Sequence, residues 1–457
     1  MKPNVLLIHC HDLGDLIGCY PGNEARTPNL DRFAAEGVVF EQYYAASPTC
    51  SPSRGAMLTG LSPHRNGLMA LASGGHWEVS PQVPTLPRLF REAGYATASF
   101  GTWHISADFA EYGVEQGTQE GPCEALAERA MRFMDQRPAG RPFFLMVGFR
   151  EPHRAWGDPA SLPWKPERAA GPGYLPDAPE IAEEMRQFYA DVGRMDAAAG
   201  ALLRHVDDHG LRESTLVVFT ADHGIAMPLA KGTLYDPGIK IALVVRWPGQ
   251  IAGGRRCDAL AWNVDLLPTL LEGAREAARI PAGLDGRSLW PYLAQGEPVG
   301  HDAVYPEQTW HDFYEPIRAI RTPRYKLIRN YETGRGVQIA ADILPSPTVD
   351  VMRETLRGWP RPPVELYDLA ADPLERRNRA GDPALAAVEA DLSARLDRWQ
   401  RETNDPILQG VVPAPIGYWE HFLAKPAGPG ALPPARGEEG WVTVRWPKGA
   451  TMHRCAK

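Results

Sequence analysis

Cysteine is scarce in this sequence. The 457 residues include six cysteines, at positions 10, 19, 50, 123, 257 and 455, and none of them has the spacing of a disulfide framework or a metal-binding motif. This pattern argues against disulfide stapling and against a cysteine-rich zinc site. We therefore expect a reducing compartment, with the cytoplasm as the default location.

Long apolar runs and an excess of positive charge are also missing. No stretch is long enough to span a bilayer, and the apolar run in the first segment, MKPNVLLIHCHD, is too short for a signal peptide. The formal net charge of −8 argues against binding to nucleic acid or to a membrane surface. An anionic substrate must therefore meet positive side chains that are placed locally.

The length and the patterning predict two domains, since single hydrophobic cores stop growing at roughly 250 to 300 residues. Residues 5–8 form a continuous apolar run, typical of a parallel strand covered on both faces, and strands alternate with helices as far as residue 315. We expect an α/β domain over residues 1–315, with a large, mostly parallel sheet between helices. Residues 316–457 would form a smaller α+β domain.

The second domain has its own signals. Residues 318–331 alternate enough for an antiparallel hairpin, and Asp382 and Pro383 precede a helix with one apolar face. That face carries Leu385, Val388, Leu392, Leu396 and Trp399. Residues 424–440 are rich in proline and glycine and predict an irregular arm, followed by an edge strand near residues 441–446.

Four apolar runs of the first domain end in histidine or aspartate. The runs at residues 5–8, 96–100, 143–149 and 216–220 are followed by His11 and Asp12, by His104, by His153, and by Asp222 and His223, respectively. Ligands of parallel sheets bind beyond the carboxyl ends of the strands, so these side chains are predicted to share one crevice. A single such histidine is more often structural, but four equivalent strand ends favour a site.

The acidic members of this set suit a metal ion. Asp12 and Asp222, with His11 and His223, offer oxygen and nitrogen ligands to one divalent cation. The alternative is structural, because Asp12 can cap a strand end and Asp222 can stabilise a turn.

The segment ASPTCSPSRGAMLTG, residues 46–60, predicts a short helix with Pro52 in its first turn and Gly60 as its stop. Cys50 then lies at the N-terminus of this helix. A cysteine exposed there is activated by the helix dipole and by Arg54, one turn further on. The alternative is that Cys50 is a small buried hydrophobic residue.

The string CSPSR, followed after three residues by LTG, resembles the signature of the type I sulfatases. The resemblance implies the fold of the alkaline phosphatase superfamily. It also implies that a formylglycine-generating enzyme oxidises Cys50 to formylglycine, whose hydrate is the nucleophile. The metal of that family is calcium, and the implied ligands here are Asp12, Asp222 and His223.

The resemblance extends to further residues, with two departures. It implies that Arg54 supports the nucleophile, that His153 and Lys231 protonate the leaving group, and that His104 acts as a base. His11 stands where the family has an aspartate, and a second imidazole shifts metal preference toward manganese or zinc. Thr102 replaces a lysine that would bind sulfate, and Arg150 or Lys240 is the candidate substitute.

Strings such as GLSPHRNGL, RPFFLMVGFREPHR and SPTVDVMRETL resemble the sulfamidase branch, the N-sulfoglucosamine sulfohydrolases. This implies a small anionic substrate, a sulfated sugar or an aryl sulfate, in which oxygen or nitrogen carries the sulfate. His64, His76, His311 and Asp312 would then border the leaving group. Alternatively, these four residues are solvated loop residues without a role in substrate binding.

Two other functions remain open from the sequence. A phosphodiesterase or phosphonate monoester hydrolase of the same superfamily would use the same nucleophile. A catalytically silent carbohydrate-binding relative would explain the His11 and Thr102 departures, although Cys50, Arg54 and Lys231 are all retained. The sequence also leaves open whether the chain forms a homo-oligomer.

Overall fold

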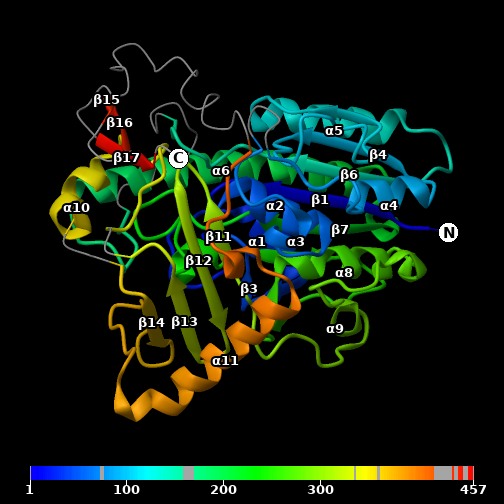
Figure 1. Cartoon of the computed structure of the whole chain (residues 1–457). Coiled ribbons are helices and arrows are strands. Elements are labelled where there is room, and N and C mark those ends of the chain that lie inside the picture. The colour runs from blue at the N-terminus through cyan, green and yellow to red at the C-terminus, as the bar shows by residue number, and fades with distance from the viewer. Residues whose placement is uncertain are drawn as a thin grey trace.

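The computed structural model describes residues 2–72, 77–157, 169–333, 336–357 and 361–415, and the backbone of three strands between residues 435 and 455. Its centre is an eight-stranded sheet (Figure 1). In spatial order the strands are β5 (Gln116–Thr118), β4 (Ala96–Gly101), β6 (Phe143–Gly148), β1 (Asn4–Cys10), β7 (Thr215–Ala221), β8 (Leu243–Arg246), β2 (Val38–Phe40) and β9 (Arg255–Cys257).

The sheet is mixed but mostly parallel. The strands from β5 to β7 run parallel to their neighbours, whereas β8 pairs antiparallel with both β7 and β2. Every residue of β1, β4, β6 and β7 is buried, because helices cover both faces of the sheet. The predicted α/β architecture is confirmed.

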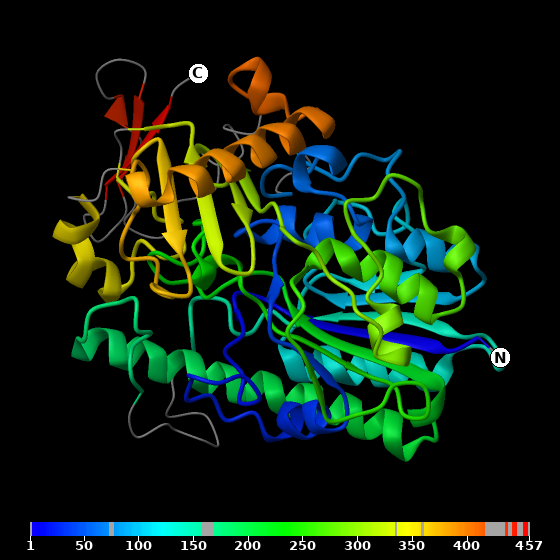
Figure 2. The same cartoon turned by 90° about the horizontal axis from the view of Figure 1, so that it is seen from below.

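Two helical layers enclose this sheet (Figure 2). One layer contains α1 (Pro28–Ala35), α5 (Cys123–Gln136) and the long α6 (Pro179–Asp208). The other contains α2 (Cys50–Thr59), α3 (Pro63–Asn66), α4 (Leu86–Glu92) and α8 (Leu266–Gly273). Further elements are α7 (Asp236–Ile239), α9 (Trp290–Gln295), the 3₁₀ turns η2 (Arg212–Ser214), η3 (Asn263–Asp265) and η4 (Ala277–Arg279), and the paired strands β3 (Tyr43–Tyr44) and β10 (Ala261–Trp262).

A second sheet, of four antiparallel strands, follows in the chain. It consists of β11 (Glu307–Trp310), β12 (Tyr314–Arg321), β13 (Tyr325–Asn330) and β14 (Val364–Asp368), with α10 (Pro347–Arg357) inserted before β14. The predicted hairpin is therefore β12 and β13. Residue 315 lies inside β12, and β11 belongs to the same sheet, so the domain boundary at 315 stays a prediction.

Helix α11 (Ala386–Glu402) covers this second sheet, after the turn η5 (Pro383–Leu385) and before the turn η6 (Pro406–Gln409). Leu392, Leu396 and Trp399 are buried in one cluster with Ile320 and Leu327 of the sheet. The Asp382 carboxylate accepts a hydrogen bond from the backbone N–H of Ala384 and caps the turn. The apolar stripe is thus core packing, as predicted.

The last described strands are β15 (Ala435–Arg436), β16 (Trp441–Arg445) and β17 (Thr451–Cys455). The strand predicted near residues 441–446 is β16, but it pairs on both sides and is central, so the expectation of an edge strand is wrong. Most of the predicted arm, residues 424–434 and 437–440, lies outside the described residues. Among the described helices, none combines the length and the apolar content that a bilayer crossing requires.

Candidate active site

The predicted strand ends meet at one edge of the large sheet. Strands β4, β6, β1 and β7 are neighbours and parallel, so their carboxyl ends lie side by side. The ring of His11, after β1, lies 4.4 Å from the ring of His153 and 5.5 Å from that of His104. It lies 5.9 Å from the ring of His223, which follows β7.

A group of metal-binding atoms occupies the centre of this edge. His11, Asp12, Cys50, Asp222 and His223 each contribute one ligand atom, all five lie within 4.8 Å of one another, and all five residues are buried. Asp12 Oδ1 lies 2.9 Å from His11 Nδ1 and 3.1 Å from His223 Nε2. Two carboxylates and two imidazoles at this spacing fit one divalent cation.

The hydrogen bonds of His223 support this fit. Its Nδ1 lies 2.9 Å from the carbonyl oxygen of Gly224, to which an N–H must donate. The Nε2 lone pair therefore faces the cluster. Histidines that bind metals commonly have this arrangement, in which one ring nitrogen donates its N–H to a carbonyl oxygen and the other binds the metal. His11 Nε2 is buried without a hydrogen-bond partner among the described residues, while its Nδ1 faces the two carboxylates.

Ion pairing keeps both carboxylates charged. Burial raises the pKa of the Asp12 carboxyl, but Lys231, His153 and His223 outweigh it and hold the pKa below its usual range. Asp222 shows the same balance, with His223, His11 and Arg54 lowering its pKa. Burial also lowers the pKa of His223 and His11, which favours the neutral imidazole that can coordinate a cation.

The backbone at two of these residues is in the left-handed region. Asp12 has φ of 56° and His104 has φ of 52°, a conformation that residues with a Cβ rarely adopt. The backbone N–H of Asp12 donates to Asp222 Oδ1 at 2.9 Å, which fixes the loop after β1 against the loop after β7. Such conformations persist where the surrounding structure enforces them, which is common at active sites.

Cys50 is the first residue of α2, and Gly60 ends that helix with a φ of 69°, both as predicted. The Cys50 Sγ lies 3.3 Å from His223 Nε2. The residue is only 3% exposed, so the expectation of an exposed, activated thiol is wrong. Burial raises the pKa of the Cys50 thiol, and an unmodified cysteine is therefore protonated and weakly nucleophilic here.

The residues after Cys50 fix α2 to the metal-binding loop. Ser53 Oγ donates to the carbonyl oxygen of Asp222 at 2.5 Å and accepts from Asn263 Nδ2 at 2.8 Å. Arg54 Nη2 lies 2.9 Å from Asp222 Oδ2. Ser53 and Arg54 thus have a structural reason to be in the motif, because both hold the helix N-terminus beside Asp222.

His9 was not predicted as a site residue, because it lies inside the apolar pattern of β1. Its Nδ1 lies 2.6 Å from Arg54 Nη1. Burial and the Arg54 charge lower the pKa of His9, so the ring is neutral and its Nδ1 accepts the Arg54 N–H. A histidine within a buried strand, followed closely by His11 and Asp12, is the sequence signal that could have identified it.

Lys231 connects the cluster to a residue that the sequence did not suggest. Its Nζ lies 3.0 Å from Asp12 Oδ2 and 2.6 Å from Asp342 Oδ2. His153 Nε2 lies 3.8 Å and 3.6 Å from the same two oxygens. Asp342 therefore completes a group of charged side chains beside Cys50, although it comes from the loop between β13 and α10.

Neither candidate replacement for the missing lysine lies in this group. Thr102 contributes only its carbonyl oxygen, 3.2 Å from Arg54 Nη1. Arg150 is exposed and donates to the carbonyl oxygen of Arg154, and Lys240 pairs with Asp15 at 3.1 Å. Both residues have other partners here, and a role of either in sulfate binding stays a prediction.

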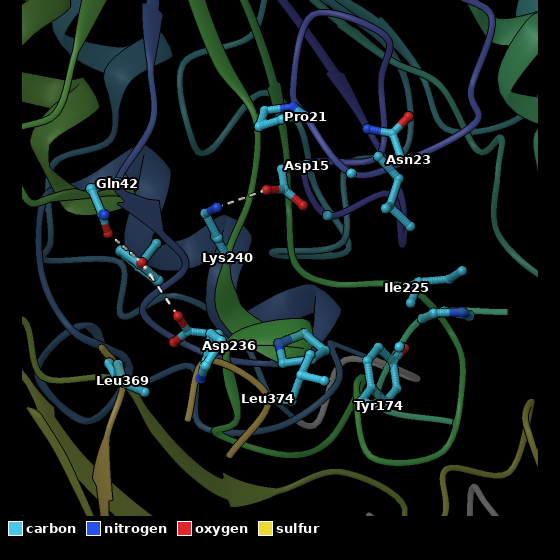
Figure 3. Close-up of a pocket in the computed structure, with 18 of the residues that line it drawn as sticks. Asp15, Pro21, Asn23, Gln42, Tyr174, Ile225, Asp236, Lys240, Leu369 and Leu374 are labelled. Atoms are coloured by element: carbon cyan, nitrogen blue, oxygen red, sulfur yellow. Dashed lines mark hydrogen bonds and ion pairs between the residues drawn. The ribbon is translucent and has the colours of Figure 1, made fainter. Parts of the chain in front are cut away.

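Figure 3 shows that Lys240 and Asp15 lie on a separate cavity. Its volume is about 700 Å³, and its lining includes Tyr174, Asp236 and Leu374. None of the residues in the metal-binding group lines it. Two parts of its lining nevertheless come from the metal-binding loops, since Gly14 is two residues after Asp12 and Ile225 is two residues after His223.

The residues predicted to border the leaving group have different neighbours and do not form one cluster among the described residues. The side chain of His64 is buried, with Nδ1 2.7 Å from Glu307 Oε2 and its ring 5.2 Å from that of Trp399. His311 Nδ1 lies 3.0 Å from Asp312 Oδ2, which also accepts the N–H of Ala341 at 2.6 Å. His76 lies outside the described residues. The substrate contacts of all four residues stay a prediction.

Comparison with known proteins identifies the family. The sulfatase family model matches residues 3–275, and the model of the N-sulphoglucosamine sulphohydrolase C-terminal region matches residues 226–341. The chain belongs to the sulfatase family. Human N-sulphoglucosamine sulphohydrolase is 31% identical, over 93% of this chain and 94% of the human protein. This sulfatase is therefore a hydrolase of sulfate esters or sulfamates, and the predicted resemblance is confirmed.

Other relatives act on sulfated sugars. The N-acetylglucosamine-6-O-sulfatase of Bacteroides thetaiotaomicron is 24% identical, over 89% of this chain and 88% of that protein. A solved structure in complex with its substrate D-glucosamine-2-N,6-O-disulfate superposes with a TM-score of 0.69 at 21% identity, covering 89% of this sulfatase and 99% of that chain. This likeness confirms the sulfatase fold.

Proposed function

We propose that this sulfatase hydrolyses a sulfated sugar through a formylglycine formed from Cys50. The observation that carries the proposal is the position of Cys50, 3.3 Å from His223 and within 4.8 Å of the Asp12 and Asp222 ligand atoms. The buried, protonated thiol is a poor nucleophile by itself, which favours a modified residue at this position. The hydrated aldehyde would supply an oxygen nucleophile and a second hydroxyl for sulfate release.

We further propose one divalent cation held by His11, Asp12, Asp222 and His223. When bound, it would neutralise charge on a sulfate oxygen. Calcium is the metal implied by the family resemblance, whereas two neutral imidazoles favour manganese or zinc. One net negative charge results from the charged side chains of the site, which are Asp12, Asp222, Asp342, Arg54 and Lys231. A divalent cation would change the net charge to positive, which favours binding of a singly charged sulfate ester or sulfamate.

The remaining residues have roles that their positions support. Arg54, fixed by Asp222 and His9, would hold the nucleophile and the sulfate oxygens. His153 and Lys231, both beside Asp12 Oδ2, would give a proton to the leaving oxygen or nitrogen as its bond to sulfur breaks. His104 would accept the proton from the second hydroxyl, so that sulfate leaves and the aldehyde is restored.

Mass analysis of the peptide that contains Cys50, from protein purified from its own cell, tests the nucleophile. We expect the aldehyde form, made by a formylglycine-generating enzyme during maturation. The peptide that contains Cys123, also buried, is the matched control and should carry an unmodified thiol. An unmodified Cys50 in active protein would contradict the proposal.

Substrate assays test the reaction. We expect hydrolysis of N-sulfoglucosamine, glucosamine 6-sulfate or an aryl sulfate to exceed that of an aryl phosphodiester or an aryl phosphonate monoester. The human relative and the B. thetaiotaomicron relative, both named for sulfated glucosamines, support this order. Faster phosphodiester cleavage would assign the chain to phosphorus chemistry. If protein that carries the aldehyde hydrolyses none of these substrates, the chain would be a catalytically silent carbohydrate-binding relative.

We also propose a cytoplasmic location, which the free thiols of Cys10, Cys19, Cys123 and Cys257 support. Fractionation of the source cell, with this chain detected by antibody, tests the location.

A further inference from the structure

One carboxylate oxygen of Asp342 has partners, and the other has no hydrogen-bond partner among the described residues. Oδ2 lies 2.6 Å from Lys231 Nζ and 3.6 Å from His153 Nε2. Oδ1 is buried and has no hydrogen-bond partner among the described residues. A buried carboxylate oxygen normally accepts at least one hydrogen bond, so this orphan oxygen indicates a missing donor.

The position of this carboxylate is fixed from outside the site. Asp312 Oδ2 accepts the backbone N–H of Ala341 at 2.6 Å, directly before Asp342. The following residue, Ile343, is fully buried in a cluster with Ala226 and Val349. Asp342 is thus held by its two neighbours in the chain, and its side chain is not a freely moving surface group.

Asp342 also lies beside the groups that are proposed to protonate the leaving atom. Lys231 and His153 are the two groups proposed to protonate that atom, and Asp342 Oδ2 contacts both. Ligand atoms of Asp12, His153 and Asp342 all lie within 4.8 Å of one another. A leaving oxygen or nitrogen placed between Lys231 and His153 is therefore within reach of the Asp342 carboxylate.

The bridging atom of the substrate decides whether this contact is favourable. In a sulfamate the bridging nitrogen carries a hydrogen, which Asp342 Oδ1 can accept. In a sulfate ester the bridging oxygen has only lone pairs, which a carboxylate repels. A site built to accept a substrate N–H discriminates against an analogue that lacks it, because its own polar group stays unpaired.

We infer that Asp342 is a specificity-determining residue that selects N-sulfated over O-sulfated substrates by accepting the sulfamate N–H. This inference rests on the proposed sulfatase function, and it adds a residue and a preference to it. His153 and Lys231 serve both substrate classes, since each can donate a proton to nitrogen or to oxygen. Asp12 Oδ2 also lies beside Lys231 and His153, but Asp12 is assigned to the cation, so Asp342 is the carboxylate left to accept the hydrogen on the bridging atom.

The test compares N-sulfo-D-glucosamine with D-glucose 2-sulfate, which differ only in the bridging atom. For the wild-type enzyme we expect kcat/KM to be higher for the sulfamate. In Asp342→Asn the amide N–H can donate to a bridging oxygen, and we expect the ratio of the two kcat/KM values to fall by roughly tenfold to a hundredfold, the scale of one charged hydrogen bond.

Asp350→Asn is the matched control, because Asp350 is exposed on α10, in the same part of the chain, and pairs only with Arg353 among the described residues. Its ratio should equal that of the wild type.

Metal content and melting temperature establish that Asp342→Asn is folded, and Asp342→Ala should also lower the ratio. An unchanged ratio in both Asp342 variants, with the sulfatase activity present, would overturn the inference alone. Wild-type protein that carries the aldehyde but cleaves neither sugar nor an aryl sulfate would overturn the proposed function itself.

Discussion

Arg54 Nη2 and Asp222 Oδ2 lie 2.9 Å apart, and both side chains are buried. This ion pair joins the helix that carries Cys50 to the loop that carries His223. A buried pair contributes little net stability by itself, but removing one partner leaves an uncompensated charge. The pair therefore couples the position of the nucleophile to the position of the metal-binding carboxylate.

The first prediction follows from that coupling. Arg54→Lys keeps the charge but loses the planar arrangement that contacts Asp222, His9 and the Thr102 carbonyl together. We expect kcat to fall by about a hundredfold or more, the scale found when a donor to developing charge is removed. Steady-state kinetics on an aryl sulfate measures this loss. Arg65→Lys, which alters a partly exposed pair with Asp285, is the control and should retain activity.

The second prediction concerns metal choice. After chelation we expect the wild-type enzyme to regain more activity with Mn²⁺ or Zn²⁺ than with Ca²⁺, because His11 Nδ1 and His223 Nε2 both face the two carboxylates. His11→Asp adds an oxygen ligand and should shift the preference toward Ca²⁺. Reactivation assays and elemental analysis of the purified protein measure both effects.

Gln295→Glu is the control for that substitution, because Gln295 is exposed at the end of α9 and lies outside the groups of potential metal ligands among the described residues. Its metal preference should match that of the wild type. A wild-type enzyme that is reactivated best by Ca²⁺ would show that the imidazoles do not control the choice.

The sequence predicts much of this site because its signals are local. Each strand end is marked by a buried run and the polar residues that follow it, and parallel pairing of β4, β6, β1 and β7 brings these ends together. The Cys50 helix is likewise marked by its own start and stop residues. These features need only the order of residues along the chain and the direction of the strands.

Asp342 shows where such reasoning ends. It lies in a loop with no periodic pattern, and its contact with Lys231 spans 111 residues of sequence. Lys240 was a candidate for sulfate binding but lines another cavity. The sequence did not reveal this, because its partner Asp15 is also distant in the chain. Pairings of this kind depend on how distant loops pack against one another, which periodicity does not reveal.

The third prediction concerns the packing of the second sheet. Arg318 is fully buried, 2.7 Å from Asp405 and 3.2 Å from Glu307, which in turn binds His64. Arg318→Met leaves two buried carboxylates without their cation, and we expect a loss of about 3 to 5 kcal/mol in the free energy of unfolding. Denaturant unfolding followed by fluorescence measures this change.

Arg324→Met provides the comparison, because Arg324 is 60% exposed and pairs with Asp368 at the end of β14. An exposed pair of this kind contributes little to stability, so we expect a much smaller loss than in Arg318→Met. Equal losses in the two variants would show that the Arg318 network is not a buried ion-pair network in solution.

The fourth prediction is a dependence of stability on pH. Glu315 is buried in β12, and burial raises the pKa of its carboxyl to about 7, against a smaller lowering effect of Arg361. The folded protein therefore holds this proton more tightly than the unfolded chain, whose glutamate pKa is about 4.3. The stability contributed by the neutral carboxyl is present below about pH 4 and is lost as the pH rises through about 7.

Glu315→Gln keeps a neutral side chain at every pH, so its stability should fall less than that of the wild type between pH 5 and pH 8. The difference between the two proteins should reach about 3 kcal/mol at most, since each pKa unit corresponds to about 1.4 kcal/mol. Melting temperatures of both proteins across this range measure it. Glu183→Gln, on the exposed side of α6, should follow the wild-type curve. Parallel curves for Glu315→Gln and the wild type would show that Glu315 is already ionised in the folded protein at pH 5.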